Sequence, residues 1–135
     1  MDSVPINHLA ILVAALSGFV IGAVWYSPLL VGNVWMKAAG LTEEQLATGN
    51  KPRIFITTFA FLLIMSFCLA MFLAVPEIDA GKGALYGFLT GFGWIFFAIG
   101  TVALFELRPW SYILVNGGYW VITMTVMGAI LGAWK

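Results

Sequence analysis

The sequence predicts an all-α fold, a four-transmembrane-helix bundle with a short interfacial helical elbow between helices 1 and 2. Two observations predict it. Apolar residues make up 62% of the 135 residues and charged residues only 9%, and the mean hydropathy is +1.02, far outside the balance of a soluble domain. The apolar residues also fall into four runs of roughly 20 residues or more, each long enough to cross the hydrocarbon core. We therefore predict a single integral membrane domain over residues 1–135.

The first span is predicted from Pro5 to Ser27, because a proline suits the first turn of a helix. Asn7 is an alternative cap for its start. The segment lacks the basic region and the A-x-A cleavage site of a secretory signal, and its apolar run is too long for one. We therefore expect a retained helix, which ends at the aromatic and proline boundary "VWYSP".

About 25 residues separate the first and second spans, which is too many for a tight hairpin. The stretch "LLVGNVWMKAAG" is apolar enough to lie in the interface as a short helix that ends at Gly40. The following "TEEQ" is typical of a capping box, with Thr42 as the cap and Gln45 three residues later. The two short helices together form the predicted elbow.

The remaining three spans are delimited by the breaks between them. The second is predicted over residues 53–75 and stops before Pro76, the third over residues 82–105, and the fourth over residues 110–134, after the break "ELRP". An even number of spans places both termini on the same side of the membrane.

Basic residues in short loops favour the cytoplasmic side of a membrane. We therefore predict that the loops after the first and third spans are cytoplasmic and that both termini are outside, in a multi-pass protein in contact with membrane lipids. The basic residues on the two sides are Lys37, Lys51, Arg53 and Arg108 against Lys82 and Lys135.

Small residues recur at every fourth position on the first, third and fourth spans. Such stripes let helices approach closely in lipid, where hydrophobicity does not drive association. They either pack the bundle of a single chain or join a homo-oligomer. The second span has no such stripe, so more lipid contact is expected there. The stripes are Ala14, Gly18 and Gly22, then Gly83, Gly87 and Gly91, and finally Gly128 and Gly132.

Polar groups in or near the spans are candidates for function because hydrocarbon does not solvate them. Asn116 lies about two turns inside the fourth span and needs a hydrogen-bond partner, which another helix or a ligand can supply. Tyr119 and Trp120 follow it on the same span. Glu106 and Arg108 close the third span, where an ion pair at the interface is the simplest interpretation.

Aromatic residues divide into two groups by depth. Trp25, Tyr26 and Trp35 lie near a predicted boundary, where an interfacial belt is expected. Trp94 and Trp120 lie near the middle of their spans. We expect them to pack the core, and the alternative is that they wall a pocket for a hydrophobic ligand.

Several kinds of chemistry have no candidate residues. One cysteine, Cys68, and one histidine, His8, predict neither a disulfide nor a metal site. Six basic and six acidic residues cancel, so nucleic acid is not expected as a partner. The motifs G-x-S-x-G and H-E-x-x-H and a phosphate-binding glycine loop do not occur. We therefore expect no enzyme, no catalytic residue and no cofactor; as an enzyme, the chain would have only Glu106 as an acid or base.

Both ends of the chain resemble the small bacterial integral membrane family catalogued as domain of unknown function 1761. The resemblance implies four transmembrane helices, a location in the bacterial cell inner membrane as a multi-pass protein, and no assigned activity. Some relatives place a histidine where this chain has Trp120. The matching motifs are W-Y-[SG]-P at Trp25 to Pro28, W-M at Trp35 and Met36, [FL]-E-x-R at Phe105 to Arg108, N-[AG]-G-Y at Asn116 to Tyr119, and M-G-A-I-L-G-x-W at Met127 to Trp134.

The predicted topology places the first four of these motifs in the cytoplasmic half of the bundle. Our hypothesis is that the residues Tyr26, Glu106, Arg108, Asn116 and Tyr119 form one polar cluster, which locks the bundle or, with Trp120, lines a ligand site. The favoured function is that of a membrane protein that binds or passes a small or lipid-like molecule, as a monomer or a homo-oligomer. The alternative is an accessory subunit that packs against a larger membrane complex.

Overall fold

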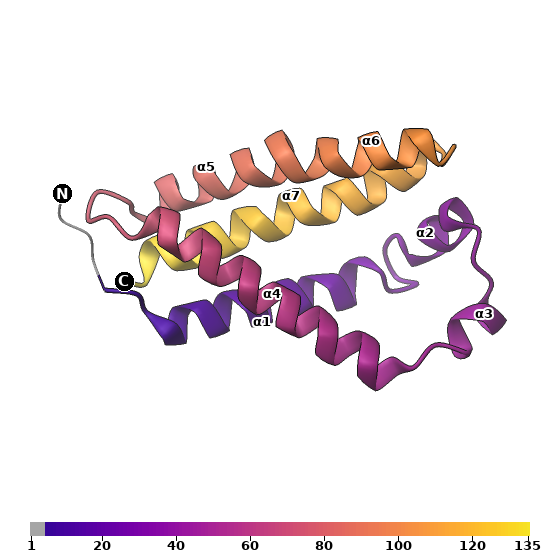
Figure 1. The fold of residues 1–135 in the computed structure, drawn as a ribbon, viewed down its shortest axis with the longest axis horizontal. Coiled ribbons are helices and arrows are strands. Elements are labelled where there is room, and N and C mark those ends of the chain that lie inside the picture. The colour runs from indigo at the N-terminus through magenta and orange to yellow at the C-terminus, as the bar shows by residue number, and fades with distance from the viewer. Residues whose placement is uncertain (1–4) are drawn as a thin grey trace.

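The computed structural model describes residues 5–135, which form helices and connecting loops without a strand. It confirms the predicted all-α class: four helical spans are long and apolar enough to cross a membrane. They are α1 (His8–Trp25), α4 (Lys51–Leu73), the segment Ala80–Phe105 and α7 (Trp110–Ala133). Figure 1 shows α7 lying beside the third span, with α1 and α4 on its other side. The chain is therefore an integral membrane protein of the multi-pass type.

Side-chain caps set the helix starts more tightly than the prolines do. The side chain of Asn7 accepts a hydrogen bond from the backbone N–H of Ala10 at 3.0 Å, so α1 begins at His8 and not at Pro5. Asn50 caps α4 in the same way by accepting from the N–H of Arg53 at 3.1 Å. Such a cap satisfies an N–H group that the helix itself leaves unpaired. The alternative start of the first helix is thus the correct one.

The elbow consists of α2 (Gly32–Ala39) and α3 (Glu43–Ala47). Gly40 ends α2 in the left-handed conformation, with φ of 70°, which glycine adopts without steric cost. The capping box is present, since Gln45 N–H donates to Thr42 Oγ1 at 3.2 Å and Thr42 N–H donates to Gln45 Oε1 at 2.9 Å. Both local predictions are therefore confirmed.

The third span is divided by a π-helical turn that the sequence does not predict. It runs as α5 (Ala80–Thr90), the π-helix η1 (Gly91–Phe96) and α6 (Phe97–Phe105). A π turn widens the helix and changes the direction in which the following side chains point. Here the ring of Phe96 occupies the space beside Gly117 of α7, where any Cβ would clash with that ring.

The glycine stripes of α5 and α7 bring the two backbones into direct contact. A Cβ on Gly83 would clash with the carbonyl oxygen of Gly128, and a Cβ on Gly128 would clash with that of Gly83. A Cβ on Gly87 would likewise clash with the carbonyl oxygen of Met124, and a Cβ on Gly132 with that of Asp79. These stripes therefore pack helices within one chain, as the first of the two interpretations predicts.

The bundle is tied together at one end and open at the other. At the closed end, Lys135 Nζ donates to the carbonyls of Leu73 at 2.7 Å and Val75 at 2.6 Å. Ser66, fully buried in α4, donates to the carbonyl of Ile11 in α1 at 2.9 Å. Towards its N-terminal end α4 diverges from α7 (Figure 1), and residues 51–58 are all exposed. The exposed half of α4 agrees with the lipid contact expected for the second span.

Candidate functional site

A pocket of about 440 Å³ lies at the open end, between α1, α2, α4 and α7. It exists because α4 diverges from α7 while α2 folds back against the start of α7. Apolar and aromatic side chains form most of its wall, and a few polar atoms lie at one end, as is typical of small-molecule sites. Its lining residues are Phe19, Gly22, Ala23, Tyr26, Trp35, Ile54, Phe55, Thr58, Asn116 and Tyr119.

Tyr26 and Asn116 form the polar end of the pocket. Tyr26 caps the end of α1, and its hydroxyl donates to Asn116 Oδ1 at 2.7 Å. Asn116 Nδ2 donates to the carbonyl of Tyr112, one turn earlier in α7, at 3.0 Å. The membrane amide thus finds the partners that its depth requires. Tyr26 points into the bundle and not to lipid, so the expected belt position is wrong for this residue.

Tyr119 holds α1 and α7 together beside this pair. It is 6% exposed, and its hydroxyl donates to the carbonyl of Gly18 at 2.7 Å. Its ring centroid lies 5.5 Å from that of Tyr26. The ring rests against Gly22, where a Cβ would approach it to 3.3 Å. The small residues of α1 therefore make room for this tyrosine.

Trp35 closes the pocket from α2. Its ring packs edge-on against Tyr26 with centroids 5.4 Å apart. Within residues 5–135 neither its indole N–H nor the hydroxyl of Thr58 takes part in a hydrogen bond with the protein. Both residues line the pocket, so both groups are free to pair with a bound molecule.

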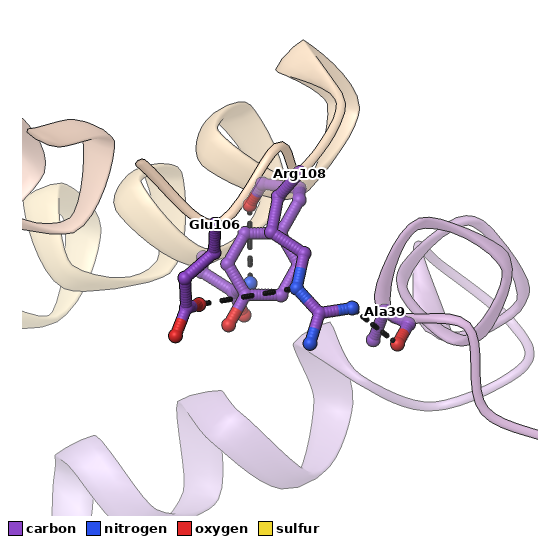
Figure 2. A network of polar contacts seen from close by, with 5 residues as sticks. Ala39, Glu106 and Arg108 are labelled. Carbon is purple, nitrogen blue, oxygen red and sulfur yellow. Dashed lines mark hydrogen bonds and ion pairs between the residues drawn. The ribbon is translucent and has the colours of Figure 1, made fainter. Parts of the chain in front are cut away.

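Glu106 and Arg108 form a separate contact that does not line the pocket. Arg108 Nη1 donates to the carbonyl of Ala39 at the end of α2, at 2.9 Å, and Nε lies 3.9 Å from Glu106 Oε1 (Figure 2). The guanidinium also lies 5.6 Å from the ring centre of Tyr112. A cation at a helix C-terminus is favourable because the last carbonyls carry negative partial charge. The contact fixes α2, and with it Trp35, against the start of α7.

The turn after α6 places Arg108 for this contact. Leu107 adopts φ of 60°, the left-handed conformation that is uncommon for residues other than glycine. The N–H of Arg108 donates to the carbonyl of Ala103 at 2.9 Å, which is the long hydrogen bond of a Schellman motif. The backbone reversal therefore points the arginine towards α2.

The structure thus brings together three of the predicted cluster residues, Tyr26, Asn116 and Tyr119, whereas Glu106 and Arg108 precede α7 and do not line the pocket. Trp120 is not a lining residue; it packs against the core and, edge-on, against Tyr119 at 4.9 Å, as expected for a packing residue.

Two tryptophans lie in positions that the sequence did not predict. Trp25 belongs to the bundle, because its Nε1 donates to the carbonyl of Val115 at 2.9 Å and its ring packs on Gly118. Trp94 is 70% exposed and lines a groove of about 220 Å³ between α4 and η1, so the expectation of core packing is wrong for it. Helical periodicity predicts which residues share one face of a helix. It does not predict whether that face packs against another helix or stays exposed.

The pocket lining lacks the side chains that most often bind transition metals or act as acids and bases at neutral pH. None of its lining residues is an Asp, Glu, His, Lys, Arg or Cys. Within residues 5–135 no group of three or more His, Cys, Asp or Glu side chains could hold a metal ion. The arrangement can bind an apolar molecule and offer hydrogen bonds to its polar end.

Comparisons with known proteins agree with this architecture at the level of the family. The searches of curated proteins and of solved structures gave no match. A family model described as Protein of unknown function (DUF1761) matches residues 9–132. The match includes the elbow, every residue of the pocket and all four spans apart from His8 and Ala133. The chain therefore belongs to the DUF1761 family.

Proposed function

We propose that this protein binds, or passes, a lipid-like molecule in the pocket between α1, α2, α4 and α7, in a bacterial inner membrane. One observation carries the proposal: a pocket of about 440 Å³ with apolar walls has the Tyr26–Asn116 pair at one end. Its volume lies within the roughly 300–1,000 Å³ of small-molecule sites. An amphipathic molecule would place its apolar part against the apolar walls and its polar part beside Tyr26 and Asn116.

Access from the lipid supports the same proposal. The first two turns of α4 are exposed and stand away from α7, so a molecule in the bilayer reaches the pocket without crossing a packed helix pair. The proposed role is binding without a chemical step, because no ionisable acid or base other than tyrosine lines the pocket. Glu106, the one enzyme candidate, lies outside it.

A single chain supplies the whole pocket. The glycines of α5 and α7 already pack against each other within one chain. A homo-oligomer would therefore form through the outer faces of the helices and would not be needed to build the pocket. The second candidate, an accessory subunit, is supported by Trp94, which is 70% exposed in the groove beside α4. A partner helix placed there would cover that ring.

Native mass spectrometry of the protein in mild detergent tests both candidates. We expect a retained molecule of lipid-like mass, which Thr58→Phe displaces because the new ring fills the pocket. Thr57→Phe is the matched control, since Thr57 is exposed and does not line the pocket. Equal retention by the two variants would refute the site. A protein of different mass that co-purifies and is lost in Trp94→Ala would instead support the accessory role.

A further inference from the structure

We infer that the molecule bound in this pocket carries an uncharged hydrogen-bonding head, a hydroxyl or a carbonyl, on its apolar body. The inference rests on the proposed function and specifies the class of ligand. It follows from the hydrogen-bonding capacity that the lining residues leave unused and from the position of the charges around them.

The free groups at the polar end include both neutral donors and neutral acceptors. Tyr26 donates its only proton to Asn116, and its oxygen can still accept. Asn116 uses one N–H on the carbonyl of Tyr112, and an amide has two. Trp35, which packs against Tyr26, adds a donor. Elsewhere in the lining, Thr58 of α4 can both donate and accept. A hydroxyl can both donate to and accept from such a set, and an ester carbonyl can accept from its donors.

A charged head at this position would lack a counter-charge. No lining residue is a lysine, arginine, aspartate or glutamate. Asn116 lies six residues after the first residue of α7, about 9 Å along the helix at 1.5 Å per residue. A charge left unpaired away from water costs far more than an unpaired neutral group.

Arg108, the basic residue in the turn before α7, already takes part in contacts within the protein. Arg108 donates to the carbonyl of Ala39 and lies beside Glu106, so binding an anion would require it to release α2. Lys51 and Arg53 lie at the exposed start of α4, just before Ile54. Neither of them lines the pocket.

The test compares three probes with the same oleoyl chain: monooleoylglycerol, its phosphorylated form oleoyl lysophosphatidate, and the cationic ester oleoylcholine. Affinities for the full chain are measured at neutral pH in detergent by native mass spectrometry and by thermal stabilisation. We expect the neutral probe to bind at least about tenfold more tightly than either charged probe. Thr58→Phe should abolish this binding, and Thr57→Phe should not.

Tyr26→Phe provides a second reading because it keeps the ring and removes the hydroxyl. We expect it to reduce the preference for the neutral probe to about threefold or less. Binding of a charged probe as tight as the neutral one, still blocked by Thr58→Phe, would overturn the inference and leave the proposed site intact. If no probe binds in a way that Thr58→Phe blocks, the proposed function itself fails.

Discussion

Helix α7 meets its neighbours α5 and α4 in two different ways. Against α5 the contact is between backbones, because Gly83 faces Gly128 and no side chain lies between them. Against α4 the helices separate towards the elbow, and the space is lined by aromatic rings and by Asn116. Small residues thus close one interface, and bulky residues with a few polar groups line the other.

The difference shows which surface has room for function. In lipid, close packing and hydrogen bonds hold helices together, and along the glycine stripes of the α5–α7 pair there is no room even for a Cβ atom. Between α4 and α7 the helices are not closely packed, and a pocket of about 440 Å³ lies there. The following variants test this contrast between the two interfaces.

Gly128→Ala should have the largest effect. The added Cβ would clash with the carbonyl of Gly83, and overpacking of this kind lowers the free energy of unfolding by about 3 kcal/mol. Denaturation in mixed detergent micelles, followed by circular dichroism, measures the loss. Gly93→Ala is the control, because a Cβ there meets no atom within 4 Å. A stable Gly128→Ala monomer that no longer self-associates would show instead that this stripe joins chains.

Tyr119→Phe should have an intermediate effect on the pocket side. It removes the hydroxyl that donates to the carbonyl of Gly18 at 2.7 Å and leaves the ring in place. Interhelical hydrogen bonds in membranes contribute about 1 kcal/mol, so we expect a loss of that size in the same assay. Tyr86→Phe, at an exposed tyrosine without a side-chain hydrogen bond in the described chain, should change nothing. Equal stability of the two variants would contradict the role of Tyr119.

Arg108→Ala should alter the elbow more than the bundle. Arg108 is partly exposed, and an exposed polar contact contributes only about 0.5 kcal/mol. Loss of the hydrogen bond to Ala39 should nevertheless free α2 and increase amide hydrogen exchange across Gly32–Ala39. Arg53→Ala, which removes an exposed arginine without this contact, is the comparison. Unchanged exchange in α2 would show that other contacts hold the elbow.

Asp79→Asn should have the smallest effect, and one that depends on pH. The backbone N–H of Lys82 donates to the carboxylate of Asp79 at 2.8 Å and lowers the pKa of that group below its usual value. A lowered pKa in the folded state means that the charge stabilises α5 at neutral pH and that this contribution is lost as the pH falls through the folded-state pKa.

The difference in melting temperature between the wild type and Asp79→Asn should therefore be present at neutral pH and disappear in acid. Glu77→Gln, in the same loop, controls for the general loss of negative charge. A difference in melting temperature that persists in acid would show that Asp79 does not stabilise the protein through its charge.

Local features of the fold were predictable from short stretches of sequence. The capping box at Thr42 and the end of α2 at Gly40 involve residues within four positions of one another. The start of α1 was left between Pro5 and Asn7, and a single side-chain hydrogen bond settles it in favour of Asn7. Helix boundaries are thus governed by near neighbours, which a sequence displays directly.

The site was predictable only in part. Tyr26 and Asn116 are 90 residues apart, and whether they meet depends on the rotation of α1 and α7 about their axes. The π turn of η1 and the exposure of Trp94 also depend on what lies beside the third span. Trp35, Phe55 and Thr58 were not expected in the pocket, because the elbow and the divergence of α4 bring them there.

The sequence by itself determined the all-α class, the number of spans and the elbow, because span length, hydropathy and capping are properties of short segments. The tertiary structure alone decided which glycines face each other and where the bundle stays open. It also decided that Tyr26 faces Asn116 and not the lipid. These are relations between distant residues, and side-chain volumes at the helix contacts set them.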